Sequence, residues 1–175
     1  MISALRQPMS KTTAAMHIKV FTAGGTIDKI YFDANSEFKV GEPQITDLLR
    51  EANVGFDYSI ESLLQKDSLE MTDADRDSIR LAVEQSDCER ILITHGTDTM
   101  AETSRVLLGV EGKTVVLTGS MQPARLRVSD AIFNIGYAIA ALQHLEHGVY
   151  IAINGRVFDP RHVHKNWEQQ RFEAD

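Results

Sequence analysis

The sequence predicts an α/β fold, a three-layer, doubly wound and mainly parallel sheet of the Rossmann or flavodoxin type. Short runs rich in Ile, Val and Leu alternate with longer runs that have the 3.6-residue spacing of amphipathic helices. The chain has 175 residues, 43% of them hydrophobic and 25% charged, which is the composition of one folded domain of ordinary size. We therefore expect a single domain over residues 16–175, preceded by a disordered tail over residues 1–15.

Each predicted strand is a short β-rich run bounded by turn residues. These runs are His17–Thr22, Asp57–Leu63, Arg90–Thr94, Lys113–Thr118 and Val149–Asn154. Helices are expected over Ile45–Asn53, Asp73–Asp87, Thr99–Leu108 and Asp130–His147. Because strands and helices alternate, neighbouring strands should be parallel, with helices on both faces of the sheet. Ligands of such sheets bind outside the carboxyl ends of the strands, so functional residues are expected in the loops that follow them.

Three of the predicted helices carry signals at their ends. The segments Thr72–Asp75 and Thr99–Glu102 have the spacing of a capping box, in which a hydroxyl and a carboxylate three residues apart satisfy each other's backbone N–H groups. Ser129 is expected to cap the fourth helix, and Gly148 stands where that helix should end.

The charge and the cysteine content exclude several classes of protein. With 18 Lys and Arg against 25 Asp and Glu, the net charge is −7, which argues against a nucleic-acid or anionic-membrane binder. The sequence has no apolar run of the ~20 residues that a membrane helix needs. Its one cysteine, Cys88, has no partner for an internal disulfide, so we expect a reducing compartment, the cytoplasm.

Small and hydroxyl-bearing residues gather in the loops after the predicted strands. Gly24–Thr26 follows the first strand, Gly96–Thr99 follows the third, and Gly119–Ser120 follows the fourth. The second of these loops has three capping-type residues in a row, more than one helix cap requires. It brings hydroxyls, a carboxylate and free backbone N–H groups to one place, as a polar binding site needs.

Other chemistries fit the sequence poorly. His162 and His164 share a strand face, but no third ligand has suitable spacing, so no metal or cofactor is expected. The segment Gly112–Thr114 lacks the upstream glycine of a phosphate-binding loop and leads into a strand. Cys88 has no evident base beside it, which makes it a poor nucleophile.

The segments Thr22–Ile27 (TAGGTI) and Ile93–Met100 (ITHGTDTM) resemble the two signature motifs of the bacterial asparaginase/glutaminase family. The His-Gly-Thr-Asp-Thr stretch is the more specific of the two. The similarity continues through Lys39–Pro43, Asp67–Thr72, Thr118–Pro123 and Asp159–Lys165. It corresponds to the N-terminal large lobe of that family. The second, smaller lobe of the family, which supplies part of the site across a subunit interface, is absent from this sequence.

The resemblance implies hydrolysis of the side-chain amide of asparagine or glutamine through a threonine acyl-enzyme. Matched residue by residue, Thr26 falls on the nucleophile, and Thr97, Asp98 and Lys165 fall on a second catalytic cluster. The residues implied to bind the substrate are Ser68, Asp98 (which also holds the α-ammonium group), Thr97, Gly25, Gly96 and Ser120. A catalytic tyrosine is implied in the loop between Ile27 and Val40, where Tyr31 is the candidate.

Chemistry supports this assignment, and two departures qualify it. A hydroxyl is a weak nucleophile until a base takes its proton, and Lys165 paired with Asp98 could do so for Thr97. Backbone N–H groups near Thr97 could hold the oxyanion. Ala23 and Leu69, however, stand where the family commonly has a threonine and a polar substrate contact.

Three functions remain open from the sequence. The first is an amidohydrolase acting on a small amino-acid amide. The others are an ammonia-releasing amidase domain that works with a partner enzyme, and a non-catalytic amino-acid-binding or regulatory relic. We also expect a homodimer, because the site would otherwise lie open to water. The helix Asp130–His147 and the segment Arg156–Asp175, with Phe158, Trp167 and Phe172, offer a surface for it. Residues Lys165–Asp175 should be ordered only in that assembly.

Overall fold

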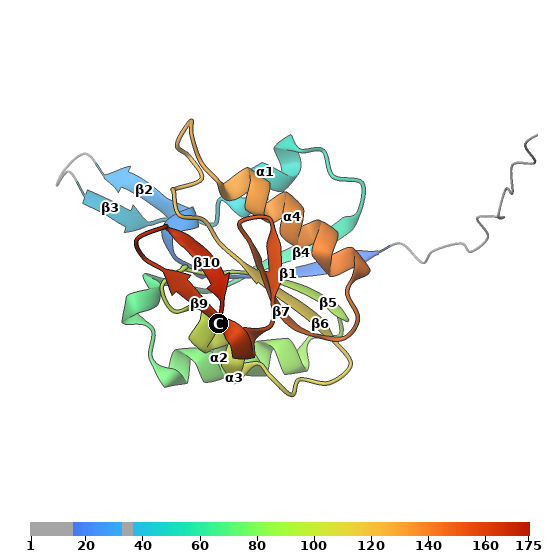
Figure 1. Cartoon of the computed structure of the whole chain (residues 1–175). Helices are drawn as coiled ribbons and strands as arrows, with labels where there is room; N and C mark the ends of the chain where they lie inside the picture. Colours follow the sequence, from blue (N-terminus) through green and yellow to red (C-terminus); the bar gives the residue numbers. More distant parts are fainter. Residues whose placement is uncertain (1–15, 33–36) are drawn as a thin grey trace, which may run out of the picture.

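The computed structural model describes residues 16–32 and 37–175, so the expected tail lies outside the described residues. Its centre is a six-stranded sheet with the order β4-β1-β5-β6-β7-β8 (Figure 1). The strands are β1 His17–Gly24, β4 Asp57–Lys66, β5 Arg90–Thr94, β6 Thr114–Thr118, β7 Gly148–Ile153 and β8 Arg156–Phe158. Neighbours from β4 to β7 are parallel, and β8 is antiparallel to β7. The predicted α/β class and mainly parallel sheet are confirmed.

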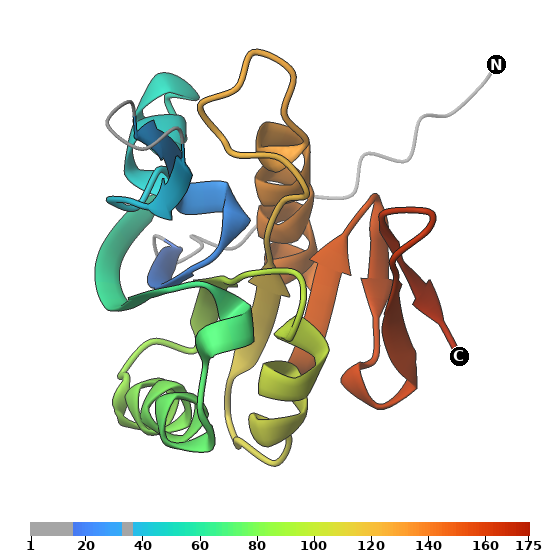
Figure 2. The same ribbon diagram turned by 90° about the vertical axis from the view of Figure 1, so that its left-hand side faces the viewer.

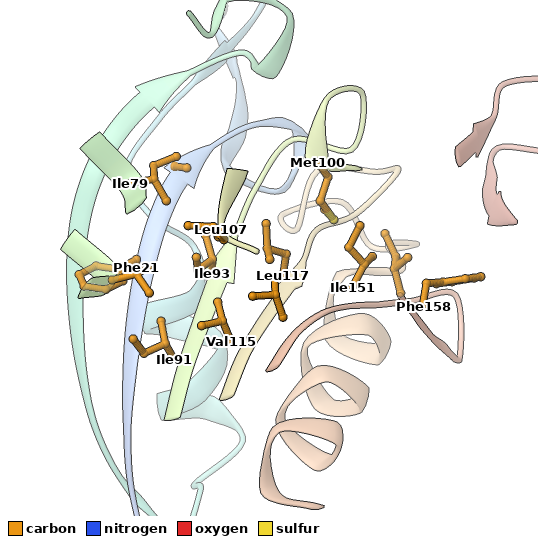
Figure 3. Close-up of a cluster of buried hydrophobic side chains, with 14 of the residues drawn as sticks. Phe21, Ile79, Ile91, Ile93, Met100, Leu107, Val115, Leu117, Ile151 and Phe158 are labelled. Carbon is orange, nitrogen blue, oxygen red and sulfur yellow. The ribbon is translucent and has the colours of Figure 1, made fainter. Parts of the chain in front are cut away.

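Two apolar layers cover the sheet because successive side chains of a strand point to opposite faces. On one face Phe21, Ile91 and Leu117 pack with α2 and α3 (Figure 3). On the other, Val20 and Leu92 pack with α1 and α4. The helices are α1 Ile45–Glu51, α2 Asp73–Gln85, α3 Met100–Val106 and α4 Ala131–His144. Strands buried on both faces explain the nearly continuous apolar runs of the sequence.

The strand order determines where a ligand can bind. Among the five parallel strands, taken in chain order, the sheet runs 2-1-3-4-5. The connections therefore leave β1 and β5 in opposite directions, and such a reversal opens a crevice outside the carboxyl ends of the two strands. Thr22 pairs with Thr94 at these ends, so the loops that follow β1 and β5 begin side by side.

Two hairpins outside the main sheet have no signal in the sequence. They are β2 Lys29–Phe32 with β3 Glu37–Val40, and β9 Val163–Asn166 with β10 Arg171–Ala174. Their strands have four residues each and mixed polarity, too short for a recognisable alternation. The C-terminal hairpin lies beside α3, on the side of the sheet that ends with β7 and β8 (Figure 2).

The C-terminal hairpin corrects one expectation. Residues 163–174 are ordered within a single chain, not only in an assembly. Phe172 of β10 is buried against Phe158 of β8, with 6.4 Å between the ring centroids. Two of the three aromatic residues expected at a dimer interface therefore belong to the chain's own core, while Trp167 is exposed.

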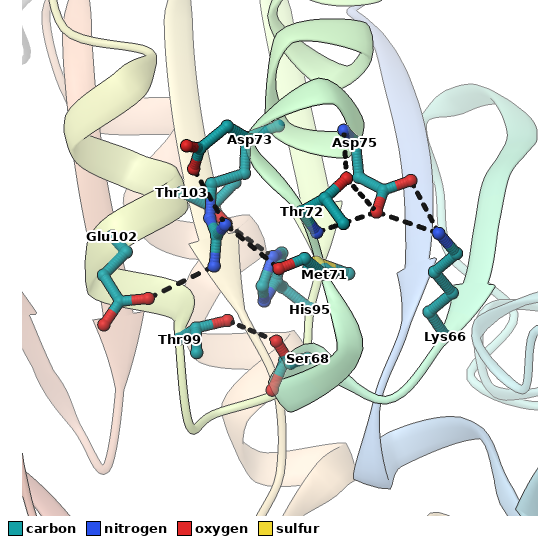
Figure 4. A network of polar contacts seen from close by, with 11 residues as sticks. Lys66, Ser68, Met71, Thr72, Asp73, Asp75, His95, Thr99, Glu102 and Thr103 are labelled. Carbon is teal, nitrogen blue, oxygen red and sulfur yellow. Dashed lines mark hydrogen bonds and ion pairs between the residues drawn. The ribbon is translucent and has the colours of Figure 1, made fainter.

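The helix ends agree with the sequence at the start of α2 and in part at the start of α4. The Thr72–Asp75 capping box is present (Figure 4). Thr99 makes no side-chain cap, because its hydroxyl donates to Ser68 O instead. At the start of α4 the N-cap position is Asp130, but Ser129 Oγ accepts a hydrogen bond from Ala131 N. The helix ends at His144, and Gly148 starts β7. With 14 residues in α4, none of the helices in the described part of the chain is long and apolar enough to cross a membrane.

Candidate active site

Two glycines bring the loops after β1 and β5 into direct contact. A Cβ on Gly25, where φ is 93°, would overlap the backbone of Gly96. A Cβ on Gly96 would lie 2.6 Å from Ser68 Cβ, in the loop after β4. Only glycine permits this approach, so the contact places the loops that carry Thr26, Ser68 and Thr97 together at the crevice.

A lysine from the C-terminal hairpin completes this group. Lys165 Nζ on β9 donates to Thr97 Oγ1 at 2.9 Å and to Asp98 Oδ1 at 2.5 Å. The side chains of Lys165 and Asp98 are 8% and 19% exposed, and Thr97 is buried. A hydroxyl, a carboxylate and an amine with little access to water thus form one hydrogen-bonded cluster, from segments 67 residues apart.

An ion pair fixes the loop that carries Ser68. Lys29 Nζ lies 2.7 Å from Asp67 Oδ2, and Asp67 Oδ1 accepts from Leu69 N. Burial raises the pKa of Asp67, but the hydrogen bond and charge of Lys29, the Leu69 N–H and the charge of Lys165 outweigh it and leave the pKa below its usual value. The carboxylate is therefore held ionised beside the cluster, and it ties β2 to the Ser68 loop.

Several hydroxyls at the crevice are left without a partner among the described residues, including the buried Thr22 Oγ1 and Thr94 Oγ1 at the ends of β1 and β5. Ser68 Oγ is buried and unpaired, although Ser68 O accepts from Thr99 Oγ1 at 2.8 Å (Figure 4). Thr26 is partly exposed, and its hydroxyl has no hydrogen bond within the described part of the chain. A buried unpaired hydroxyl is costly, so Ser68 Oγ is in place to bond a ligand, while the partly exposed Thr26 hydroxyl is free to contact one.

The remaining predicted site residues are placed less directly. Ser120 Oγ donates to Gln122 O at 2.5 Å, so its hydroxyl serves the loop's own backbone. The backbone of Tyr31 pairs with Phe38 in the β2–β3 hairpin, but its side chain lies outside what the structure describes. His164 Nδ1 pairs with Asp175 Oδ1 at 2.7 Å, and the described residues contain no group of three or more His, Cys, Asp or Glu suited to a metal ion.

Sequence patterns did not reveal the side chains that hold the site's loops in place. Asp130 accepts hydrogen bonds from the backbone of Met121 and Gln122 after β6. The buried Asn134 donates to Gly119 O and accepts from Asn154 N, at 3.0 Å in both cases. Asn154 Oδ1 in turn accepts from Phe172 N. This chain of amides fastens the hairpin that carries Lys165 to the sheet, and only the partners' positions in space reveal it.

Two buried ionisable groups lie next to the loops of the site. Asp28, two residues after Thr26, accepts from Gln44 N at 2.8 Å, and burial raises its pKa to about 6 despite that hydrogen bond. Burial also lowers the pKa of His95, just before Gly96, to about 4. His95 Nδ1 faces Gly96 O at 2.8 Å and must donate to it, so the neutral ring accepts from Thr103 through Nε2.

We expect Asp28 and His95 to give the fold opposite pH dependences. The folded state holds the Asp28 proton more tightly than the unfolded chain, so stability falls as the pH rises from 3.8 to about 6. His95 is held neutral, so stability falls as the pH drops from 6.5 to about 4. Asp28→Asn removes only the first effect. In urea unfolding, the stability of this variant should therefore drop more steeply than that of the wild type below pH 6.5, by about 2 kcal/mol at pH 4.

The comparison above pH 7 is the internal control, because neither group changes its charge there and the two pH curves should run parallel. Equal slopes of the two proteins between pH 4 and 6 would contradict the raised pKa of Asp28.

The chain matches one known family over almost all of the described residues. The model of the N-terminal domain of asparaginase covers residues 17–174. The chain belongs to the asparaginase family. The resemblance seen in the Thr22–Ile27 and Ile93–Met100 motifs is therefore confirmed, and these motifs form the two loops that meet at Gly25 and Gly96.

Relatives and solved structures of the asparaginase family agree with this assignment. A glutaminase-asparaginase of Acinetobacter glutaminasificans is 32% identical over 129 residues, 70% of this chain and 38% of that protein. The "Probable L-asparaginase periplasmic" of Haemophilus influenzae is 31% identical over 162 residues, which are 85% of this chain and 46% of that protein. A glutamyl-tRNA(Gln) amidotransferase subunit of Methanococcus vannielii is 36% identical over 77 residues, which are 43% of this chain and 18% of that protein. The thermostable L-asparaginase of Thermococcus kodakarensis superposes with a TM-score of 0.77 at 27% identity, over 91% of this chain and 51% of that one. The chain thus spans about half the length, or less, of these asparaginase relatives.

Proposed function

We propose that the chain is an asparaginase-type amidohydrolase that converts the side-chain amide of asparagine, with glutamine as a second substrate, into the acid and ammonia. Residues 16–175 form one domain in this proposal. The observation that carries it is the buried cluster of Lys165, Thr97 and Asp98 beside the loop of Thr26. An amine in contact with both a hydroxyl and a carboxylate is the arrangement that activates a hydroxyl.

The first step forms an acyl-enzyme on Thr26. Its free Oγ1 bonds to the amide carbon, the C–N bond breaks, and the hydroxyl proton leaves with the nitrogen as ammonia. Water then cleaves the ester, which releases the acid and restores the threonine. Ser68 Oγ, buried and unpaired, is in place to bond the substrate, with the backbone of Gly25 and Gly96 beside it. Backbone N–H groups near Thr97 hold the oxyanion.

The second cluster moves protons. In its neutral form Lys165 accepts the Thr97 proton, and the ionised Asp98 carboxylate, with Oδ1 at 2.5 Å, stabilises the ammonium that results. Thr97 then takes the proton of the attacking water. Little solvent reaches Lys165, so the exchange stays within the cluster. Asp98 also holds the α-ammonium group of the substrate.

Ammonia release tests the proposal. Purified protein is incubated with asparagine, glutamine and simple amides, and both ammonia and the acid are measured. The two products should appear in equal amounts. Asparagine should be the best substrate. Asp98→Asn keeps the shape of that side chain but removes its charge, and should lower turnover about 100-fold or more. Equal turnover of the two proteins would contradict the role of the cluster.

The amidotransferase relative favours a second candidate, in which the domain releases ammonia for a partner enzyme. In that case turnover of free asparagine is slow and rises when the partner is present. A binding relic would instead take up aspartate without releasing ammonia from any amide. Trp167 is the chain's one tryptophan, and its ring lies 4.3 Å from Lys165 Nζ, so its fluorescence reports binding in both cases.

We also propose a homodimer, formed through α4, in the cytoplasm. Ile132 and Phe133 on α4 are more than half exposed, as is Val128 just before it, and no charged residue occurs from Ala131 to Gln143. An uncharged apolar face on a chain of net charge −7 favours pairing with a copy of itself. Sedimentation at micromolar concentration should give a dimer, and Phe133→Asp a monomer. A wild-type monomer of 19.5 kDa would contradict this pairing.

A further inference from the structure

Trp167 occupies an unusual place for a large apolar side chain. It follows β9 at the start of the turn to β10, and 56% of it is exposed. Burial in the core therefore does not account for a tryptophan at this position. Among the described residues its ring has one electrostatic contact, with Lys165 Nζ at 4.3 Å from the ring centroid.

The turn holds Trp167 in place through its own hydrogen bonds. Gln170 Nε2 donates to Trp167 O at 2.7 Å, and Gln169 N donates to Asn166 Oδ1 at 3.0 Å. Phe172, on the other side of the turn, is buried in the core. The ring therefore stands on an anchored segment instead of a free loop.

The Trp167 ring lies against the ammonium group of Lys165, a member of the proposed site. Lys165 Nζ has Thr97 Oγ1 and Asp98 Oδ1 as hydrogen-bond partners, and the indole face occupies space that water would otherwise take. A lysine ends a flexible four-carbon stem and has many rotamers. The negative face of an aromatic ring attracts a cation, so the indole favours the rotamer that reaches Thr97.

We propose that Trp167 is a positioning residue: it shields the Lys165 ammonium and holds it on Thr97 and Asp98. This inference rests on the proposed function for its effect on turnover, but not for its effect on Lys165 itself. Trp167 acts through Lys165, so its loss should lower kcat more than it raises KM.

The test compares Trp167→Leu, which keeps an apolar side chain without a ring, with Trp167→Phe, which keeps an aromatic face. Lysines are acetylated briefly with N-hydroxysuccinimidyl acetate, and the modified peptides are counted by mass spectrometry. Lys165 should react about five-fold faster in the leucine variant than in the wild type, and within about two-fold of it in the phenylalanine variant. Lys29 and Lys66, each paired with a carboxylate, should react at the same rate in all three proteins.

Turnover is measured on the same samples. The leucine variant should lose about ten-fold in kcat with KM within about two-fold, and phenylalanine should restore most of the loss. An unchanged Lys165 labelling rate overturns the proposal, as does faster labelling with unchanged kcat. If the wild type releases no ammonia from any amide, the proposed function fails, while the labelling rates still decide whether Trp167 positions Lys165.

Discussion

Thr26→Ala and Thr97→Ala should each lower kcat for asparagine about 1,000-fold or more while leaving the protein folded. Thr26 supplies the oxygen that forms the acyl-enzyme, and Thr97 is the hydroxyl on which Lys165 acts. Groups that act as one unit lose their effect together. The double variant should therefore be hardly slower than either single one. Ammonia release and urea unfolding on the same samples measure both properties.

Thr46→Ala is the matched control, because Thr46 is an exposed threonine on α1, outside the crevice. It should keep the kcat of the wild type. Ammonia release at the wild-type rate in both Thr26→Ala and Thr97→Ala would refute the assignment of the two threonines.

Gly25→Ala should lower both the stability and the activity of the protein strongly. Gly25 has a φ of 93°, and its Cβ would overlap the backbone of Gly96. The left-handed conformation costs an alanine about 1 kcal/mol, and the overlap adds about 2 kcal/mol or more because neither backbone can yield without moving its loop. Moving these loops separates Thr26 from Thr97, so kcat should fall about 100-fold.

Gly109→Ala separates the two causes. Gly109 has a φ of 88°, but nothing lies within 4 Å of its added Cβ. This variant should lose only about 1 kcal/mol and keep its activity. If Gly25→Ala is no less stable than Gly109→Ala and equally active, the contact between the loops does not organise the site.

The sequence predicted those strands and helices whose burial leaves a recognisable pattern in their own residues. Strands such as Arg90–Thr94 and Thr114–Thr118 are buried on both faces. Such strands consist of nearly continuous apolar residues, which can be recognised in the sequence alone. The helix α4 was predicted three residues too long at its end, because Gly148 begins the next strand and does not end the helix. The Thr99–Glu102 capping box was wrong because Arg76 and Ser68 bind these side chains from elsewhere in the chain.

For the candidate site the sequence determined which residue types stand at the ends of the strands. Gly25, Thr26, Gly96, Thr97 and Asp98 lie within a few positions of strands that the residues themselves predict. The family resemblance then supplied Lys165, whose predicted role stays a proposal. Only the tertiary structure decided that Lys165 meets Asp98 at 2.5 Å, that Lys29 holds Asp67, and that Trp167 covers the ammonium. These contacts join segments far apart in the chain, and their geometry depends on how the sheet and hairpins pack, whereas local patterns record only the residues next to each position.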